Sequence, residues 1–300
     1  MRYYTESDTL FVRGSFRAAS TGVNGGIRSV STLLNHTLRP DCDAADAEKV
    51  LEVSAAAAGI GGDYFGILTT VPVNRACVLQ YDFTTVFITA GIRREEPGRA
   101  GSINIIVTSS EGMSDGALLE TIMVATEAKA EALLTLDLPL TGTPADTVMA
   151  GCEGEERHYS AGRLTESGKR VREAVLHGIP AALTRHDTGV AADRPAFFIF
   201  SRIKGEHWIG WSMENCPYYP CHFKGQSCDF CYCPFYPCKD ENLGQWASSS
   251  NGSRVWNCAA CNLLHKPVVA RYLRKYPGAS LSELVRVGNR KKGKSSGAHS

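Results

Sequence analysis

The residues best suited to chemistry form a cysteine cluster near the C-terminal end of the chain. Eight of the eleven cysteines lie between positions 216 and 261, and the pairs Cys228/Cys231 and Cys258/Cys261 have C-x-x-C spacing. Because thiolates at this spacing can hold a zinc ion between two turns, these pairs predict one tetrahedral zinc site. The N-terminus has no apolar signal region, which favours metal ligation over disulfides. The eight candidate ligands are Cys216, Cys221, Cys228, Cys231, Cys233, Cys238, Cys258 and Cys261.

The thiols outside these two pairs, with His222 and His265 in reserve, would complete a second site. This grouping stays open, and so does a four-thiolate iron–sulfur cluster in place of zinc. We expect the metal to be structural, because a segment of about 55 residues with so little aliphatic content needs a cross-link, such as a bound metal ion, to fold.

A zinc-finger module that binds nucleic acid is a further interpretation, suggested by aromatic residues within the cluster and basic residues after it. Residues 271–300 hold eight Lys and Arg residues against one acidic residue. The chain as a whole has a net charge of only +1, and Lys and Arg are sparse between positions 216 and 261. Nucleic-acid binding is therefore the less favoured interpretation.

Small and polar residues gather at several turns of the first 200 residues. The clearest are residues 20–26 (STGVNGG), the pair Asn35-His36 and residues 141–146 (TGTPAD). Glycine-rich and threonine-rich turns can direct backbone N–H groups towards an anion, but most are only turns. Taken singly, none of these motifs identifies a reaction.

In their order and spacing, the motifs resemble those of the adenosylcobinamide amidohydrolase family of corrinoid salvage. The cysteine-rich segment also looks like a small domain that occurs fused to that enzyme or alone. One departure from the family pattern is Pro144-Ala145, where a small or hydroxyl pair is common, although Asp146 is in place. The matching segments are STGVNGG, LLNHTL, ILTTVPV, ITAGI, GSINIIV, SDGALLETIMVATEAKAEAL and TGTPADTV.

The resemblance implies hydrolysis of the amide that joins aminopropanol to the corrin ring of adenosylcobinamide, giving adenosylcobyric acid. The expected partner is a corrinoid, and its cobalt belongs to the substrate, so the hydrolysis requires no cofactor of its own. Two alternatives stay open: an amidohydrolase that acts on complete cobamides, and a corrinoid-binding protein without catalysis.

Amide hydrolysis needs an activated nucleophile, donors for the oxyanion and an acid for the leaving amine. His36 is the first choice for the acid–base role, because imidazole titrates near neutral pH. Ser20 or Thr21 would act as nucleophile or position water, and Asp146 would orient His36 or bind a substrate amide; packing, turn or capping roles are the alternatives. The other candidates are Glu127 for catalysis and, for substrate binding, Asn24, Gly25, Gly26, Asn35, Asn104, Lys129, Thr141 and Thr143.

Apolar runs and helical periodicity predict an α/β fold, with a layered mixed-sheet N-terminal domain. The predicted helices span 44–58, with Asp41 or Asp43 as N-cap, 115–134, with Ser114 as N-cap, and 165–177, ended by Gly178 and Pro180. The predicted strands span 9–12, 65–71, 84–89, 103–109, 147–150 and 196–200.

Composition divides the chain into an α/β domain (1–205), a cysteine-rich zinc-binding module (206–287) and a basic, disordered tail (288–300). Within the module, two short helices are predicted over 264–275 and 281–287. No apolar run approaches the roughly 18–20 residues of a membrane helix, so we expect a cytoplasmic protein with no membrane partner. The oligomeric state does not follow from the sequence.

Overall fold

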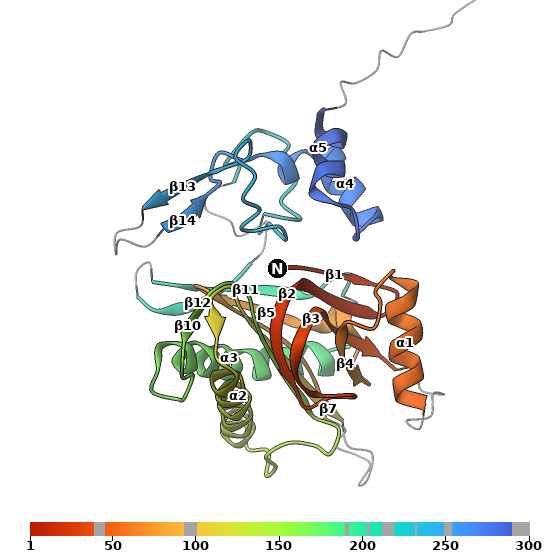
Figure 1. The fold of residues 1–300 in the computed structure, drawn as a ribbon, viewed down its shortest axis with the longest axis vertical. Helices are drawn as coiled ribbons and strands as arrows, with labels where there is room; N and C mark the ends of the chain where they lie inside the picture. Colours follow the sequence, from red (N-terminus) through yellow and green to blue (C-terminus); the bar gives the residue numbers. More distant parts are fainter. Residues whose placement is uncertain are drawn as a thin grey trace, which may run out of the picture. The chain divides into compact units, whose positions relative to one another are not determined.

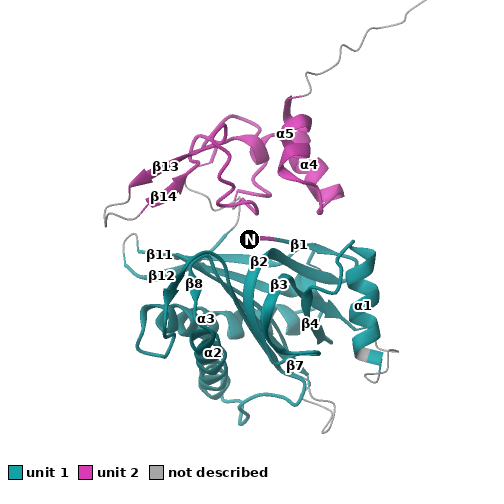
Figure 2. Cartoon of the chain, in the orientation of Figure 1, with its two compact units in different colours: residues 1, 3–211 teal, residues 2, 212–300 magenta. Residues whose placement is uncertain are grey.

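The computed structural model describes residues 1–38, 46–92, 101–189, 192–202, 205–211, 219–231, 233–248 and 254–289. The chain forms two compact units, made mainly of Tyr3–Trp211 and Ser212–Ser300 (Figure 2). The predictions for Asp41, Asp43, Cys216 and the end of the tail fall outside the described residues.

In its described residues, unit 1 is built on one ten-stranded mixed sheet with three α-helices (Figure 1). This confirms the predicted layered α/β fold. The sheet strands are β1 (Arg2–Glu6), β2 (Thr9–Ser20), β3 (Gly26–Thr37), β4 (Tyr64–Thr69), β5 (Cys77–Tyr81), β6 (Thr84–Gly91), β7 (Ser102–Ser109), β9 (Thr147–Cys152), β11 (Ala196–Ser201) and β12 (His207–Gly210). The other elements are α1 (Ala47–Ala57), η2 (Val73–Arg75), α2 (Asp115–Thr135), α3 (Glu166–Asp187), and the separately paired β8 (Gly112–Met113) and β10 (Glu156–His158).

The strand order is β12-β11-β5-β6-β7-β9-β2-β3-β4, with β1 paired to β2. The pairs β3/β4, β7/β9 and β5/β11 are parallel, whereas the other path pairs are antiparallel. The long β2–β3 hairpin runs from the pair Thr9 and His36 at one end to Ser20 and Gly26 at the other. The STGVNGG motif is therefore the turn of this hairpin, and His36 lies at its open end.

The sheet is rolled, so that strands from different parts of the order face one another. One buried apolar cluster combines Phe65 of β4 with Val78 of β5 and Phe87 of β6, although β4 and β5 are far apart in strand order. A hydrogen bond of 3.0 Å between the hydroxyls of Thr69 (β4) and Ser102 (β7) also spans the roll. Figure 1 shows the bend of β2 and β3 that makes this possible.

Helices bury the outer face of the sheet. α2 begins as predicted, with the hydroxyl of Ser114 accepting a hydrogen bond from the N–H of Ala117 at 3.1 Å. α1 packs on β2 and β3 through Leu51 and Ala55. The cluster under α2 and α3 includes Leu79, Ile88, Ile105, Val124, Leu133, Val175 and Ile179.

Two expectations about local structure were wrong. α3 continues to Asp187, past Gly178 and Pro180, because Gly178 gives α3 a close approach to the sheet: a Cβ there would lie 2.5 Å from Ile88 and 2.7 Å from Leu79. Tertiary packing thus overrides the helix-stop signal. The sequence pattern also missed β1, β3, β5, β8, β10 and β12. β3 carries polar residues that conceal its alternation.

Unit 2 has a hairpin of β13 (Gln245–Ser248) and β14 (Arg254–Asn257), a 3-10 turn η3 (Leu263–His265), and helices α4 (Pro267–Lys275) and α5 (Leu281–Asn289). The predicted helix over 264–275 is thus divided: α4 starts only at Pro267, a residue suited to the first helical position. A small apolar core joins these helices to the cysteine-rich loops. It contains Leu263, Leu264, Val269, Leu273, Ala279 and Leu284.

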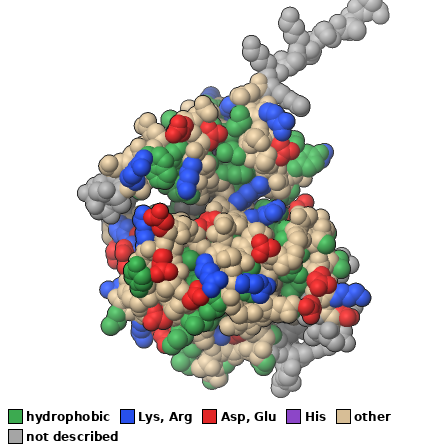
Figure 3. All heavy atoms as spheres, viewed as in Figure 1, with side chains coloured by type: hydrophobic (Ala, Val, Ile, Leu, Met, Phe, Trp, Pro, Cys, Tyr) green, Lys and Arg blue, Asp and Glu red, His purple; other side chains and the backbone are tan. Residues whose placement is uncertain are grey.

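None of the described helices is long and apolar enough to cross a membrane. On the face drawn in Figure 3, basic and acidic side chains are interspersed.

An aromatic cluster at the edge of unit 1 is expected to make the stability of this unit sensitive to acid. The ring of His177 stacks on Trp208, with centroids 5.4 Å apart, and meets Phe198 edge-on at 5.1 Å. Burial lowers the pKa of His177 below its ordinary value of 6.5. The unfolded chain therefore binds a proton at a higher pH than the folded chain, so the free energy of unfolding should fall as pH drops below about 6.5.

Urea unfolding at about pH 7.5 and pH 5.5 measures this effect. The His177→Phe variant should lose less stability between the two pH values than the wild type, by up to about 1.4 kcal/mol per pH unit. Equal losses in the two proteins would contradict the assignment to His177.

Candidate active site

The STGVNGG turn is held by hydrogen bonds within the protein. The hydroxyl of Ser20 accepts from the N–H of Gly22 at 3.0 Å, and the N–H of Gly25 donates to the carbonyl of Gly22 at 3.0 Å. The hydroxyl of Thr21 lies 3.0 Å from the N–H and 3.3 Å from the carbonyl of Val148. The N–H of Gly25 is thus already engaged and is not aimed at an oxyanion. The exposed Asn24 and Gly26 adopt positive φ values of 52° and 115°.

This close packing explains the glycine at position 25. A Cβ there would lie 2.4 Å from the carbonyl oxygen of Ser20 and 2.9 Å from that of Gly22, both backbone atoms. We expect Gly25→Ala to lower the free energy of unfolding by about 1–3 kcal/mol, as overpacking does. Gly62→Ala is the matched control, because a Cβ at Gly62 meets nothing within 4 Å. Urea unfolding compares the two, and similar stabilities would refute the steric argument.

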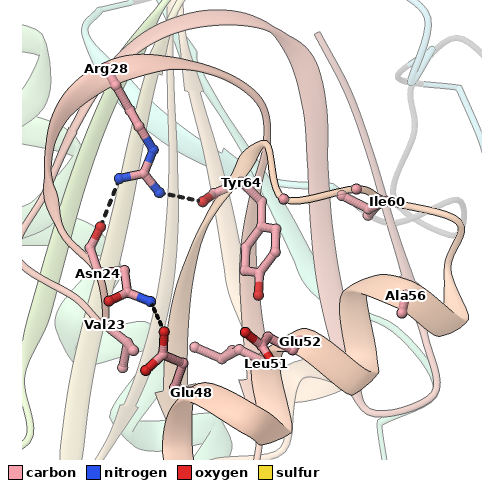
Figure 4. Close-up of a pocket in the computed structure, with 11 residues that line it drawn as sticks. Val23, Asn24, Arg28, Glu48, Leu51, Glu52, Ala56, Ile60 and Tyr64 are labelled. Atoms are coloured by element: carbon pink, nitrogen blue, oxygen red, sulfur yellow. Dashed lines mark hydrogen bonds between the residues drawn. The ribbon is translucent and has the colours of Figure 1, made fainter.

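A cavity of about 400 Å³ opens beside this turn, between α1 and the start of β4 (Figure 4). The side-chain amide of Asn24 donates to Glu48 at 2.5 Å, and Arg28 donates to the carbonyls of Asn24 and Tyr64 at 2.8 and 2.9 Å. The cavity therefore presents amide, carboxylate and guanidinium groups around an apolar floor. Its lining residues are Val23, Asn24, Arg28, Glu48, Leu51, Glu52, Ala56, Ile60, Gly61, Gly62 and Tyr64.

The surroundings of Tyr64 at the cavity wall change the pKa of its hydroxyl. Burial, with the nearby carboxylates of Glu52 and Glu48, raises the pKa of Tyr64. Its hydroxyl is therefore protonated at neutral pH and is available as a hydrogen-bond donor. Such a site can bind a ligand that carries amide groups, because it offers both donors and acceptors.

His36 lies away from this turn. By the hairpin register, ten residues of β3 separate it from Gly26, or about 33 Å of extended strand. Its Nδ1 atom lies 2.7 Å from the hydroxyl of Thr9 and 3.2 Å from that of Ser54 on α1. These contacts orient a half-buried imidazole, but they do not join His36 to Ser20 or Thr21.

Two asparagines predicted to bind substrate are buried inside the roll. Asn104 is 1% exposed; its side chain donates to the carbonyl of Leu68 at 3.0 Å and accepts from the N–H of Thr147 at 2.9 Å. Asn35 is 2% exposed and donates to Thr89 at 3.0 Å. The geometry therefore gives both residues a role in joining strands, and their predicted substrate contact stays a prediction.

Asp146 forms a buried cluster with Lys129. Its carboxylate accepts from Lys129 Nζ at 2.5 Å, from the N–H and hydroxyl of Thr143 at 2.9 and 2.7 Å, and from the N–H of Ile103 at 2.8 Å. Its described partners thus belong to α2, the TGTPAD loop and β7, which corrects the expectation that Asp146 orients His36.

Glu127 is exposed, and with Lys129, Thr141 and Thr143 it lines an open depression of about 610 Å³.

Ser167, His158 and Glu111 form a chain of hydrogen bonds like that of a catalytic triad, but the serine is not accessible to a substrate. The Oγ atom of Ser167 lies 3.0 Å from Nδ1 of His158, whose Nε2 lies 2.8 Å from the carboxylate of Glu111. Ser167 has an exposure of 0%, so its hydroxyl does not reach a substrate in this structure. We assign this group to the attachment of β10 to the start of α3.

The cysteine-rich loops of unit 2 contain the predicted C-x-x-C turns. The N–H of Cys231 donates to the carbonyl of Cys228 at 3.2 Å, and that of Cys261 to Cys258 at 2.9 Å. Within the part of the chain that the structure describes, no three Cys, His, Asp or Glu side chains are placed to hold a metal ion. The rings of His222 and His265 are 4.3 Å apart.

The described thiols of unit 2 form two groups. Burial raises the pKa of Cys233 to about 12, and the charges of Cys258, Cys238 and Cys261 add to this effect. In the other group, the side-chain amide of Gln226 donates to the sulfur atoms of Cys221 and Cys228 at 3.3 and 3.2 Å.

Comparison with known proteins identifies both units. The family model described as adenosylcobinamide amidohydrolase matches residues 2–190. The chain belongs to the adenosylcobinamide amidohydrolase family. A second model, described as a cysteine-rich small domain, matches residues 207–287.

Two relatives named adenosylcobinamide amidohydrolase align with more than half of this chain. The adenosylcobinamide amidohydrolase of Methanosarcina mazei is 36% identical over 196 residues, which is 61% of this chain and 98% of the relative. The enzyme of the same name from Halobacterium salinarum is 29% identical over 194 residues, 57% of this chain and 81% of the relative. A third relative has no activity in its name: an uncharacterized protein of Methanocaldococcus jannaschii is 54% identical over 57 residues, 19% of this chain and 48% of the relative.

For this member of the amidohydrolase family, the candidate site residues chosen from the sequence do not include most of the residues that line the cavity. Arg28, Glu48, Glu52 and Tyr64 lie outside the motifs that carried the resemblance, and only Asn24 was named in advance. One signal was present: Glu48 and Glu52 have the i, i+4 spacing that places two side chains on one face of a helix.

Proposed function

We propose that this chain hydrolyses adenosylcobinamide at the amide joining aminopropanol to the corrin ring, giving adenosylcobyric acid. The observation that carries the proposal is the match of the amidohydrolase family model over residues 2–190. The Methanosarcina mazei relative of that name aligns over 98% of its own length, so the similarity spans a whole protein with this activity in its name.

The cavity beside the STGVNGG turn is the proposed contact for the corrin periphery. A corrin ring carries side-chain amides, which need hydrogen-bond donors and acceptors on the protein. Asn24, Glu48 and Tyr64 supply both kinds of group at the cavity wall, and Leu51 and Ile60 supply apolar surface. This chemistry supports corrinoid binding next to a motif that belongs to the family pattern.

Direct attack by water fits the geometry better than a covalent intermediate. The hydroxyls of Ser20 and Thr21 are engaged with backbone atoms of Gly22 and Val148, and no described hydrogen bond joins either hydroxyl to a basic side chain. In the proposed step, water oxygen bonds to the amide carbon, the C–N bond breaks, and a proton passes to the departing amine. His36 is the proposed group for this proton transfer, because its Nδ1 atom contacts Ser54 of α1, the helix whose Glu48, Leu51 and Glu52 line the cavity.

Mass spectrometry of adenosylcobinamide incubated with the full-length chain tests the proposal. Release of adenosylcobyric acid and free aminopropanol in equal amounts is the expected result. Unchanged adenosylcobinamide in the presence of folded, metal-loaded protein would overturn it. Complete cobamides, incubated in parallel, test whether a larger substrate is cleaved at the same bond.

For unit 2 we propose a structural metal, with zinc as the ion. The support comes from the residues: seven described thiols, two C-x-x-C turns and a small apolar core of six buried residues. When bound, zinc would cross-link the loops and stabilise the fold, without taking part in the amide hydrolysis.

A further inference from the structure

The cysteine-rich segment contains a short sequence repeat. The pattern Cys-Pro-x-Tyr-Pro-Cys occurs at residues 216–221 and again at 233–238, and each copy is followed along the chain by a C-x-x-C pair, at 228–231 and at 258–261. A repeat of loop and C-x-x-C turn suggests two equivalent units, each supplying four thiolates to one ion. This differs from our expectation that the two C-x-x-C pairs share an ion.

The backbone brings the second copy of the pattern, the loop of residues 233–238, to the second C-x-x-C turn at residues 258–261. The antiparallel hairpin of β13 and β14 pairs Gln245 with Asn257, so the chain leaving the loop and the chain entering the turn run side by side. The hydroxyl of Tyr236, within the loop, donates to the carbonyl of Trp256 at 3.1 Å. The N–H of Tyr236 also donates to the carbonyl of Cys233 at 3.0 Å, which closes the loop on itself.

The thiols carried by these two segments are neighbours. Cys238 closes the loop that begins at Cys233, and the N–H of Cys261 donates to the carbonyl of Cys258 at 2.9 Å, so each segment carries two thiols. Cys233 and Cys261 also pack against the same apolar cluster. The four side chains therefore gather around one region of unit 2.

The first C-x-x-C turn has a different neighbour. The side-chain amide of Gln226, which is 5% exposed, bridges the sulfur atoms of Cys228 and Cys221. Cys221 ends the first copy of the repeat. Gln226 therefore links the first C-x-x-C turn, at residues 228–231, to the end of that first copy. The grouping of both turns thus agrees with the repeat.

We infer that Cys233, Cys238, Cys258 and Cys261 form one four-thiolate site for a single divalent ion of the zinc type. Four thiolates on two turns are the donor set that zinc takes in structural sites. Because a metal site of this kind rarely exists in the unfolded chain, ion binding is expected to contribute directly to the folding of unit 2. The inference rests on the structural metal proposed for unit 2 and is independent of the proposed catalytic activity.

Zinc stoichiometry of full-length variants tests the grouping. The double variants C233S/C238S and C258S/C261S should each bind one zinc ion fewer than the wild type, and combining all four substitutions should remove the same single ion. If the C-x-x-C pairs shared an ion instead, the combined variant would lose two ions. C152S is the matched control, because Cys152 is a buried cysteine of unit 1 and should leave the zinc content unchanged.

A measurement on the wild type avoids variants that fail to fold. Limited treatment of the zinc-loaded chain with a chelator, followed by thiol alkylation and peptide mass spectrometry, shows which cysteines become accessible together. Joint labelling of Cys233, Cys238, Cys258 and Cys261 supports the site, whereas joint labelling of Cys258 and Cys261 with Cys228 and Cys231 overturns it. Iron and sulfide bound to these four cysteines in the purified chain would overturn the zinc assignment.

Discussion

Replacing His36 by Ala should lower kcat for adenosylcobinamide hydrolysis by about 100-fold or more, because a positioned acid–base group contributes roughly 10²–10⁴-fold to such a reaction. His36 is the proposed group because its ring is half-buried and oriented through Nδ1 by the hydroxyls of Thr9 and Ser54. Initial rates measured by chromatography give kcat, and titration of the corrinoid absorbance gives the dissociation constant, which should change little.

Two further variants make this test specific. His207→Ala removes an exposed histidine of β12 and should keep the wild-type kcat. Ser54→Ala removes one partner of Nδ1 and should cause a smaller loss in kcat than His36→Ala, because it disturbs the orientation of the ring without removing it. Wild-type turnover by the His36→Ala variant would exclude His36 from the chemistry and direct attention to Glu48, Glu52 and Tyr64 of the cavity.

Replacing Asp146 by Asn should destabilise unit 1 by about 3–5 kcal/mol, because it leaves the ammonium group of Lys129 buried without its counter-charge. The side chains of the pair are only 7% and 8% exposed, and their atoms lie 2.5 Å apart. In a unit of this size, such a loss corresponds to a fall in Tm on the order of 10 °C. Differential scanning calorimetry and urea unfolding of the full chain measure it.

The double variant K129M/D146N separates charge from packing. If the buried charge causes the instability, adding Lys129→Met to Asp146→Asn should recover part of the lost stability, because no unpaired ammonium then remains. A double variant no more stable than Asp146→Asn would instead assign the effect to the hydrogen bonds that Asp146 accepts from Thr143 and Ile103.

The sequence alone determined the features that depend on local pattern. The Ser114 cap of α2 follows from a preference that acts within one turn of helix. The family could also be predicted, since motif identity and order survive without knowledge of how the motifs meet in space. The α/β class follows for a similar reason, because strands and helices have different residue periods.

Only the tertiary structure decided which of these residues share a site. β3 runs ten residues between Gly26 and His36, so two motifs close in sequence stand at opposite ends of one hairpin. Conversely, the roll of the sheet and the path of α2 bring Lys129 to Asp146, and the β13–β14 hairpin brings the loop of Tyr236 to Trp256. The physical reason is that register, curvature and helix placement are set by packing over the whole domain, which local sequence pattern does not encode.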